Sequence, residues 1–307
     1  MKTLVYTSIY SNLWGTEFGG RPSREYHYKS SLYNILNINA SKFICFTSKE
    51  ELNDLENYFY TKNKVSKEKL EFKIFDLTKT KNFDKIKLKK DLNLMKQTDR
   101  CFEIQYNKFH WLDQIDDLNS YDRVFWVDAG LSHSGLFPES MSLVTTYDRY
   151  FWFNVFNEKF LNELINGSEN KLIIVGKENL GEFYWSKTLP KEYYNEYNSS
   201  YHIIGGFFGG KVELLLQLKN KFETLLEYLL KVESQNFMEE LIMSCLYFNN
   251  QHMFNLWSFQ DWYERPNHKD RNIKYFYNLF DNCSPIDKQL EREDAIRRVL
   301  NKKYPVK

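Results

Sequence analysis

The stretch Tyr121-Asp122-Arg123-Val124-Phe125-Trp126-Val127-Asp128-Ala129-Gly130-Leu131-Ser132-His133 sets the expected fold. It holds a short, fully apolar run, Val124 to Val127, that ends in the carboxylate of Asp128. A continuous β-branched and aromatic run of this length predicts a strand buried on both faces. In open α/β sheets, ligands bind in the crevice beyond the carboxyl ends of the strands, so Asp128 is a candidate ligand-binding residue. An ordinary strand end, with Asp128 capping the next turn, is the alternative interpretation.

Strands and helices are expected to alternate before this stretch. Three apolar runs predict strands: Leu4 to Ile9, Lys42 to Thr47 and Phe72 to Leu77. Ser23 is a candidate cap for a helix beginning at Arg24, and Ser48-Lys49-Glu50-Glu51 has the pattern of a capping box. A further helix is expected from Thr98 to Leu118. The order strand–helix–strand–helix–strand predicts the start of a parallel, right-handed α/β sheet.

After the apolar strand, the pattern of alternating elements continues. Strands are expected at Lys171 to Val175, Tyr201 to Gly210 and His252 to Trp257, and helices at Val212 to Val232, Glu233 to Asn249 and 285–303. No internal repeat or domain-scale linker interrupts the chain, which predicts a single domain over residues 1–307.

Composition limits the class of protein. Net charge is +1, from 42 basic and 41 acidic residues, which argues against a protein built mainly to hold nucleic acid. The four cysteines lack CxxC spacing, so buried thiols in a reducing compartment are expected instead of disulfides or a zinc site. No signal peptide and no run of 18 apolar residues is present, which predicts a cytoplasmic protein without a transmembrane segment.

Three further segments contain candidate binding residues. The loop from Tyr10 to Ser23 contains Gly19, Gly20 and Arg21 and lies between a predicted strand and the start of a predicted helix. Such an arrangement either binds an anion at the helix N-terminus or is an ordinary connecting loop. Lys108 either joins an ion-pair ladder with Arg100 and Glu103 or faces the nucleotide crevice.

The third segment, Tyr201-His202-Ile203-Ile204-Gly205-Gly206-Phe207-Phe208-Gly209-Gly210, carries two Gly-Gly pairs. Glycine permits positive φ and close approach of the backbone to a ligand or to a neighbouring element. A structural bulge would need one pair, so two pairs favour a ligand-facing role. Residues 79–90 hold a run of lysines, which is read either as a solvated loop or as a lid or acceptor-binding segment.

These pieces, in this order, resemble a glycosyltransferase of the GT-A fold, the type that binds nucleotide-diphospho-sugars. The resemblance rests on Val127-Asp128-Ala129-Gly130 at the place of the family's Asp-x-Asp signature, on the helix expected from Glu103 to Leu118, on the Gly-Gly strand and on Glu239-Glu240 in the helix beyond. Small bacterial transferases of the lipopolysaccharide and capsule kind often show a similar Trp-x-Asp-x-Gly strand end. The match spans roughly residues 1–270.

The resemblance implies a doubly wound, mixed and mainly parallel sheet flanked by helices. Residues 1–135 would form the nucleotide-sugar-binding half and residues 136–270 the acceptor-side half. The donor would be bound by a set of residues from both halves: Tyr10, Gly19, Gly20, Arg21, Lys108, Asp128, Gly130, Gly205 and Gly206.

One departure from the family concerns the metal. Gly130 replaces the second aspartate, whose carboxylate in the family contacts the divalent metal between the two phosphates. The departing diphosphate needs a counter-charge. The resemblance therefore implies manganese or magnesium at Asp128, helped by His133 or His268. The alternative is a metal-independent enzyme in which Arg21 and Lys108 supply the positive charge.

The resemblance also implies the chemistry. If the enzyme inverts, Glu239 or Glu240 would deprotonate the acceptor hydroxyl. If it retains, the leaving phosphate can take the proton. For both acids the alternative is a solvated position in the first turn of a helix.

Three functions remain open at this point. The first is a hexosyl- or pentosyltransferase that acts on a bacterial surface glycan. The second is a bacteriophage enzyme that glycosylates a hydroxylated base in modified DNA. The third is a non-catalytic binding protein on a GT-A scaffold, for which the missing second aspartate would be the signature.

Overall fold

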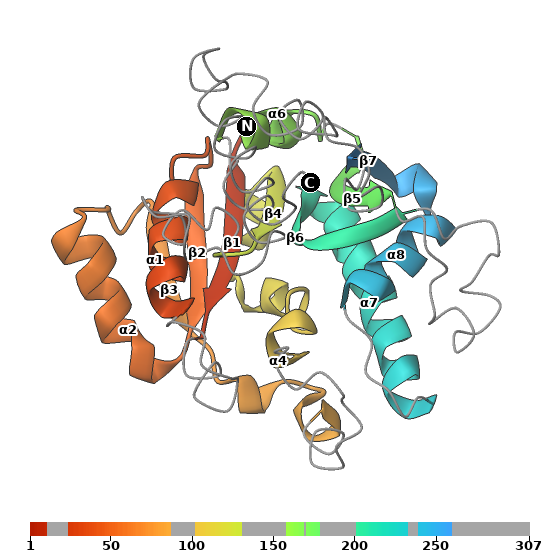
Figure 1. Ribbon diagram of the computed structural model, residues 1–307, viewed down its shortest axis with the longest axis horizontal. Coiled ribbons are helices and arrows are strands. Elements are labelled where there is room, and N and C mark those ends of the chain that lie inside the picture. The colour runs from red at the N-terminus through yellow and green to blue at the C-terminus, as the bar shows by residue number, and fades with distance from the viewer. Residues whose placement is uncertain are drawn as a thin grey trace, which may run out of the picture.

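The computed structural model describes residues 1–10, 24–86, 102–130, 158–168, 170–178, 201–232 and 239–259. Within these ranges the strands are β1 (Thr3–Ile9), β2 (Lys42–Thr47), β3 (Leu70–Ile74), β4 (Arg123–Val127), β5 (Leu172–Glu178), β6 (Tyr201–Lys211) and β7 (Phe254–Phe259). The longer α-helices are α1 (Arg24–Ile35), α2 (Lys49–Glu56), α6 (Glu158–Asn166), α7 (Val212–Val232) and α8 (Glu239–Asn249), and a short π-helix, η3 (Asn57–Lys62), follows α2 directly. Figure 1 shows their arrangement.

The strands form one sheet in the order β3-β2-β1-β4-β6-β5-β7. The pairs β3–β2, β2–β1, β1–β4 and β5–β7 are parallel, whereas β6 runs antiparallel to both of its neighbours, β4 and β5. The predicted mixed, mainly parallel sheet is therefore confirmed. The chain proceeds from β1 outward to β3 and then returns to β4 on the other side of β1, which makes the β1–β4 junction a topological switch point.

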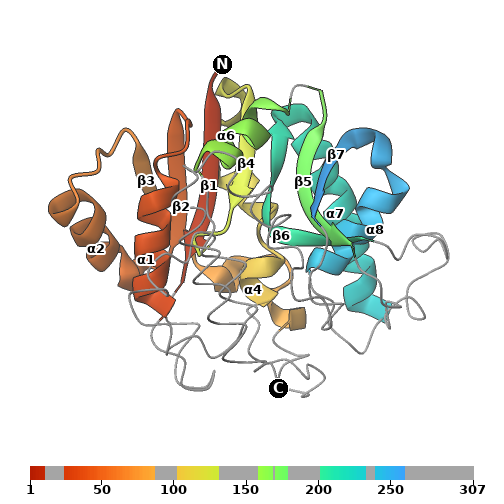
Figure 2. The ribbon, with the colours of Figure 1, turned by 45° about the horizontal axis from the view of Figure 1, so that its top comes forward.

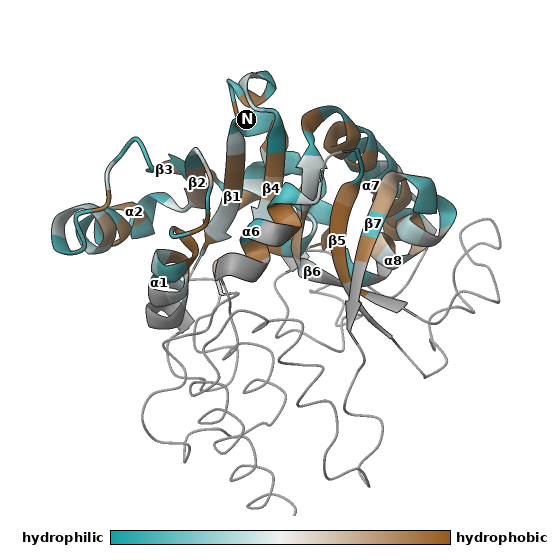
Figure 3. Ribbon diagram, turned by 90° about the horizontal axis from the view of Figure 1, so that it is seen from above, coloured by the Kyte–Doolittle hydropathy of each residue, from teal (hydrophilic) through white to brown (hydrophobic). Residues whose placement is uncertain are grey.

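Helices cover both faces of the sheet because alternate strand residues point to opposite sides. On one face, Val5 and Phe125 belong to a buried cluster that includes apolar residues of α1, α2 and α6. On the other, Tyr6 and Trp126 belong to a cluster with residues of α7, α8 and the segment 106–121. Figure 2 shows this layering, and Figure 3 shows apolar residues along the strands and on the helices beside them.

Several predicted strands have other bounds in the structure, among them the strand predicted at Lys171 to Val175, which is Leu172–Glu178. The third strand is Leu70–Ile74 instead of Phe72 to Leu77, because Asp76 begins a 3₁₀ turn, η4 (Leu77–Lys79), by accepting a hydrogen bond from the Thr78 N–H at 3.0 Å. The last strand is likewise Phe254–Phe259, since the predicted start at His252 lies in the turn η9 (Gln251–Met253).

The long helix predicted from Thr98 to Leu118 is wrong over its described part. That segment contains the single turn α4 (Phe102–Gln105) and two 3₁₀ turns, η5 (His110–Gln114) and η6 (Leu118–Ser120). The side-chain amide of Asn107 donates to the Glu103 carbonyl, while the Asn107 N–H bonds the Ile104 carbonyl. Side-chain amides that bond the backbone in this way compete with a regular helix.

The capping box at Ser48 is also wrong in detail. Helix α2 begins at Lys49 as predicted, but the Ser48 side chain makes no cap hydrogen bond. The Glu51 carboxylate instead accepts from the hydroxyls of Thr47 and Ser48 at 3.2 and 3.5 Å. Helix α7 matches its prediction, and α8 is described from Glu239 onward.

Other expectations have mixed outcomes. Cys45 and Cys245 are free, buried thiols, as predicted, and no helix in the described part of the chain is long and apolar enough to span a bilayer. In the lysine run, Ile86 is buried and Lys81 pairs with Glu227 of α7, so part of this run packs on the protein itself. Ser23 and the helix expected at 285–303 lie outside the described residues.

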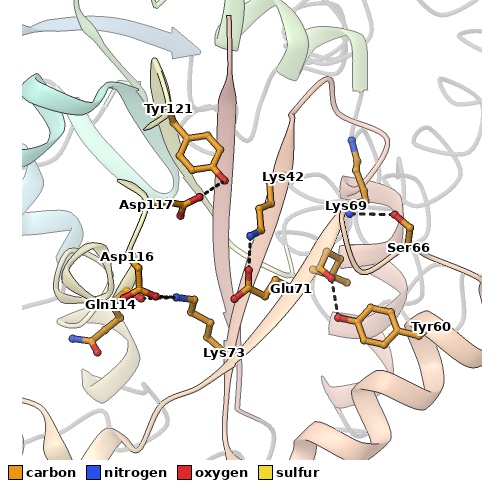
Figure 4. Close-up of polar contacts among 11 residues, drawn as sticks. Lys42, Tyr60, Ser66, Lys69, Glu71, Lys73, Gln114, Asp116, Asp117 and Tyr121 are labelled. Carbon is orange, nitrogen blue, oxygen red and sulfur yellow. Dashed lines mark hydrogen bonds and ion pairs between the residues drawn. The ribbon is translucent and has the colours of Figure 1, made fainter. Parts of the chain in front are cut away.

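Polar contacts fasten the segment before β4 to the outer strands (Figure 4). Lys73 of β3 donates to the carbonyl of Gln114 at 3.0 Å and pairs with Asp116 at 2.8 Å. The hydroxyl of Tyr121, the residue before Asp122, donates to Asp117 at 3.3 Å. These contacts hold the segment that leads into β4.

Candidate functional site

The candidate site lies at the switch point, where β1 and β4 end side by side. Tyr10 follows β1 and Asp128 follows β4, and these two strands pair in parallel. Tyr10 is 4% exposed, donates its hydroxyl to the Phe75 carbonyl at 3.0 Å and stacks on Trp111 at 6.0 Å between ring centroids. Its phenol is thus engaged with the protein, whereas the side chain of Asp128 is 42% exposed.

Only one oxygen of the Asp128 carboxylate is occupied by described residues. Oδ1 accepts from the indole Nε1–H of Trp126 at 2.8 Å and lies 3.1 Å from the Nζ of Lys108. The Asp128 backbone N–H donates to the Gly206 carbonyl at 2.8 Å, which fixes the main chain at the strand end. Asp128 is therefore held through Oδ1, and Oδ2 has no hydrogen-bond partner among the described residues.

Lys108 lies behind Asp128, with 5% of its side chain exposed. Its Nζ donates to the Gly205 carbonyl at 2.9 Å and to Oε1 of Glu239, besides contacting Asp128, and it lies 5.1 Å from the centre of the Trp126 ring. Burial alone would lower the pKa of this ammonium, but the charges of Asp128 and Glu239 outweigh burial and raise it. Lys108 is therefore charged at neutral pH.

Glu239 is the first residue of α8 and is 3% exposed. Burial raises the pKa of its carboxyl to about 8, and the nearby ammonium of Lys108 opposes that shift while the charge of Asp128 adds to it. Its Oε2 is buried and has no hydrogen-bond partner in the described part of the structure. We define Lys108, Asp128, Gly205 and Glu239 as the lysine cluster.

The two Gly-Gly pairs of β6 serve different purposes. A Cβ at Gly205 would lie 1.9 Å from Oε1 of Glu239, so this glycine leaves the space that the acid occupies. A Cβ at Gly209, where φ is +157°, would lie 2.3 Å from the Val124 carbonyl of β4. Only the first pair belongs to the candidate site, and the second permits the close pairing of β6 with β4.

The structure thus brings together several residues that the sequence analysis selected: Lys108, Asp128, Gly205, Gly206 and Glu239. Gly130 is buried in the turn after Asp128, and Glu240 is half-buried beside Glu239. Five other candidates lie outside the described residues: Gly19, Gly20, Arg21, His133 and His268.

The sequence analysis missed the role of Trp126 as a hydrogen-bond donor to Asp128. Side chains two residues apart on a strand lie on the same face, so this spacing was a usable signal.

A second polar group, which also went unpredicted, lies between η5 and α7. Potential ligand atoms of His110, Asp113 and Glu223 lie within 4.8 Å of one another, and no other such group occurs within the described ranges. The Nζ of Lys219 lies 2.8 Å from Asp113 and 3.5 Å from Glu223. A single lysine thus contacts both carboxylates, and Asp128 does not belong to this group.

No protein family and no curated protein sequence matches the chain. Three solved structures share a similar chain path. Mouse xyloside xylosyltransferase 1 in its apo form matches with a TM-score of 0.46 and 9% identity, over 93% of this chain and 95% of that chain. The galactosyltransferase LgtC, in complex with donor and acceptor sugar analogues, matches with a TM-score of 0.43 and 9% identity, over 82% and 72%.

The third structure is the 4-diphosphocytidyl-2C-methyl-D-erythritol synthase of Anaerococcus prevotii, with a TM-score of 0.46 and 10% identity, over 84% and 86%. These similarities are at the level of the fold and assign no function. The order and direction of the described strands agree with the predicted GT-A-like arrangement, a mixed and mainly parallel sheet flanked by helices.

Proposed function

We propose that this protein is a glycosyltransferase that moves a sugar from a nucleotide diphosphate donor to an acceptor hydroxyl. The observation that carries the proposal is Asp128, a half-exposed carboxylate at the switch point of the sheet, with Oδ1 held by Trp126 and Lys108. Ligands of open α/β sheets bind in this crevice. The remaining oxygen, Oδ2, is available to a donor or to a metal that accompanies it.

The residues fit a divalent metal that is held mainly by the substrate. Because Oδ1 is engaged, Asp128 offers one oxygen, and magnesium is commonly bound through one or two carboxylates together with substrate phosphates. The carboxylate of Asp128 has no hydrogen-bond partner at Oδ2 among the described residues, so a positive charge there is electrostatically favourable. When bound, the metal would stabilise the charge of the departing diphosphate. His133 and His268 remain the candidates for additional ligands.

Of the two acids proposed as the base, we assign the role to Glu240 in an inverting reaction. A base has to reach the acceptor hydroxyl, and Glu240 is half-buried, whereas Glu239 is 3% exposed and contacts Lys108. Glu239 then serves as the buried partner of the lysine. We propose a bacterial surface glycan as the acceptor, since a net charge of +1 gives little general attraction for DNA.

The proposal is tested by the thermal stability of the protein with UDP, GDP, CDP and dTDP and their sugars, each with and without manganese. A ligand at a hundred times its Kd raises the free energy of unfolding by about 2.7 kcal/mol. We expect one nucleotide to raise the melting temperature, and Asp128→Asn to weaken this nucleotide's binding and so reduce the shift. Lys73→Met, which removes contacts with Gln114 and Asp116 and touches none of the residues around Asp128, is the control and should keep it.

The outcome separates the open functions. Stabilisation by a nucleotide sugar without turnover on any hydroxyl acceptor would favour a binding protein over an enzyme. If no nucleotide stabilises the protein, the glycosyltransferase proposal is wrong.

A further inference from the structure

The ammonium of Lys108 has no hydrogen left for a ligand. A lysine carries three N–H donors. Three acceptors surround Nζ: the Gly205 carbonyl at 2.9 Å, Oδ1 of Asp128 at 3.1 Å and Oε1 of Glu239. With 5% of its side chain exposed, Lys108 could reach a donor phosphate only by leaving all three. This arrangement is at odds with the direct donor contact that its place in the sequence suggested.

The three partners come from distant parts of the chain. Asp128 follows β4, Gly205 lies in β6 and Glu239 begins α8. Gly205 and Glu239 are 97 and 131 residues away from Lys108 in the sequence. A buried lysine that joins three elements in this way fixes the strand end of β4 relative to β6 and α8.

We propose that Lys108 is a positioning residue, which fixes the Asp128 carboxylate so that Oδ2 faces the ligand crevice. The inference rests on the proposed function, because it assigns to Asp128 the donor or its metal as ligand. Lys108 acts through Asp128 and does not itself contact the substrate.

The geometry of Oδ1 explains why Lys108 is needed. With Trp126 as the only donor, the carboxylate would have a single hydrogen bond and could rotate about it. A second donor on the same oxygen, coming from Lys108, restricts that rotation. Hydrogen bonds from a charged donor are stronger than neutral ones, and partners behind a ligating carboxylate contribute to affinity through its orientation.

Contact with Glu239 lowers the free-energy cost of burying the Lys108 ammonium. An isolated charge in the interior is strongly destabilising, and a carboxyl group in contact offsets part of its desolvation. Gly205 is required as well, because any side chain there would displace Oε1 of Glu239. The lysine cluster therefore holds the Asp128 carboxylate in place.

The test uses the full-length variant Lys108→Met/Glu239→Gln, because Lys108→Met alone leaves a buried acid without its partner. The matched control is Lys73→Met. Binding of the nucleotide that stabilises the wild type is measured by calorimetry with manganese. We expect the double variant to bind about 10- to 100-fold more weakly, the range for loss of a partner behind a ligating group, and the control to bind like the wild type.

A double-mutant cycle separates positioning from general structural damage. If Lys108 acts through Asp128, then adding Lys108→Met/Glu239→Gln to Asp128→Asn should cause no further loss of affinity. Equal losses in the presence and absence of the Asp128 carboxylate would overturn the inference, and so would unchanged binding by the double variant.

A spectroscopic measurement tests the inference without any ligand. The indole N–H of Trp126 donates to Oδ1, so its NMR resonance reports on the carboxylate. We expect this resonance to shift in the double variant and to stay in place in Lys73→Met. If no nucleotide binds the wild type, the proposed function fails while this resonance can still overturn the inference. An unchanged Trp126 resonance in the double variant would show that Lys108 does not orient Asp128.

Discussion

Gly205 is the residue on which the buried charges depend most directly. Its missing side chain leaves the space for Glu239, and a Cβ there would lie 1.9 Å from Oε1. At a pH above about 8, where the Glu239 carboxyl is ionised, we expect Gly205→Ala to displace the acid from Lys108 and to lower the free energy of unfolding by about 3–5 kcal/mol, the usual cost of breaking a buried ion pair. Chemical denaturation measures this loss.

The same clash provides its own control. In a Glu239→Ala background the carboxylate is absent, so Gly205→Ala should cost little beyond the loss already caused by Glu239→Ala. Additive losses would mean that the two residues do not compete for the same space.

Individual residues of the candidate site were easier to predict from the sequence than the contacts between them. Asp128 was predictable because a carboxylate ends a buried apolar run, and Gly205 because glycines are rare in strands. The contact between Lys108 and Glu239 joins residues 131 positions apart, and no local pattern encodes it. The same holds for the exposure of neighbouring Glu239 and Glu240, which depends on how α8 packs.

Among the elements, α6 is tied to the sheet near its C-terminal end by a buried side chain of β4. Arg123 of β4 is 6% exposed, and its Nη1 donates to the carbonyls of Ile165 and Asn166 at 2.6 and 3.3 Å. These carbonyls belong to the last turn of the helix, where no backbone N–H is available within the helix.

We therefore expect Arg123→Met to lower the free energy of unfolding by about 1.5–3 kcal/mol, the range for hydrogen bonds that involve a charged group, while the Ser168 hydroxyl still donates to the Ile165 carbonyl at 2.7 Å. Hydrogen exchange should become faster in α6 and remain unchanged in α7. Lys73→Met is the control, because its partner Asp116 is 93% exposed and exposed pairs contribute about 0–1 kcal/mol. Uniformly faster exchange throughout the chain would contradict a local role for Arg123.

Periodicity predicted elements well where burial is regular. The runs at β1, β2 and β4 and the amphipathic pattern of α7 gave the right element in the right place. Between 102 and 120 the same kind of reasoning failed, because many apolar residues suggested a helix. There the aromatic side chains of Phe109 and Trp111 pack against Phe208 and Trp126, and this tertiary packing accompanies short turns instead of a continuous helix.

For the molecule as a whole, Glu239 predicts a dependence of stability on pH. Its carboxyl titrates near its ordinary value of 4.5 when the chain is unfolded and at about 8 in the folded protein. Between these values the folded state binds more protons, so this group makes the free energy of unfolding fall as the pH rises from 4.5 to 8. The charged groups around it are Lys108, Asp128 and Glu240.

Glu239→Gln should reduce this decline, because the amide does not titrate. The comparison requires urea denaturation of the wild type and the variant at several pH values from 5 to about 8, the window set by the two pKa values. Parallel curves for the two proteins would show that Glu239 titrates normally.

The overall topology was predictable in part. Alternating strands and helices in the first third of the chain predict parallel pairing, and right-handed crossovers leave few arrangements. The mixed sheet came from the resemblance to GT-A enzymes. The reversal of β6 between β4 and β5 has no signature in its own residues, because a strand buried on both faces looks alike in either direction.

The long separation between Lys108 and Glu239 has a consequence for synthesis on the ribosome. When the strand ending at Asp128 has left the exit tunnel, the codon for Glu239 has yet to be translated, so the nascent chain carries a lysine without its acid. The crevice can acquire its final shape only after α8 has emerged and docked. A ligand would therefore be recognised there only by chains in which α8 has docked. A fragment that ends before α8 would instead be a target for chaperones and proteases.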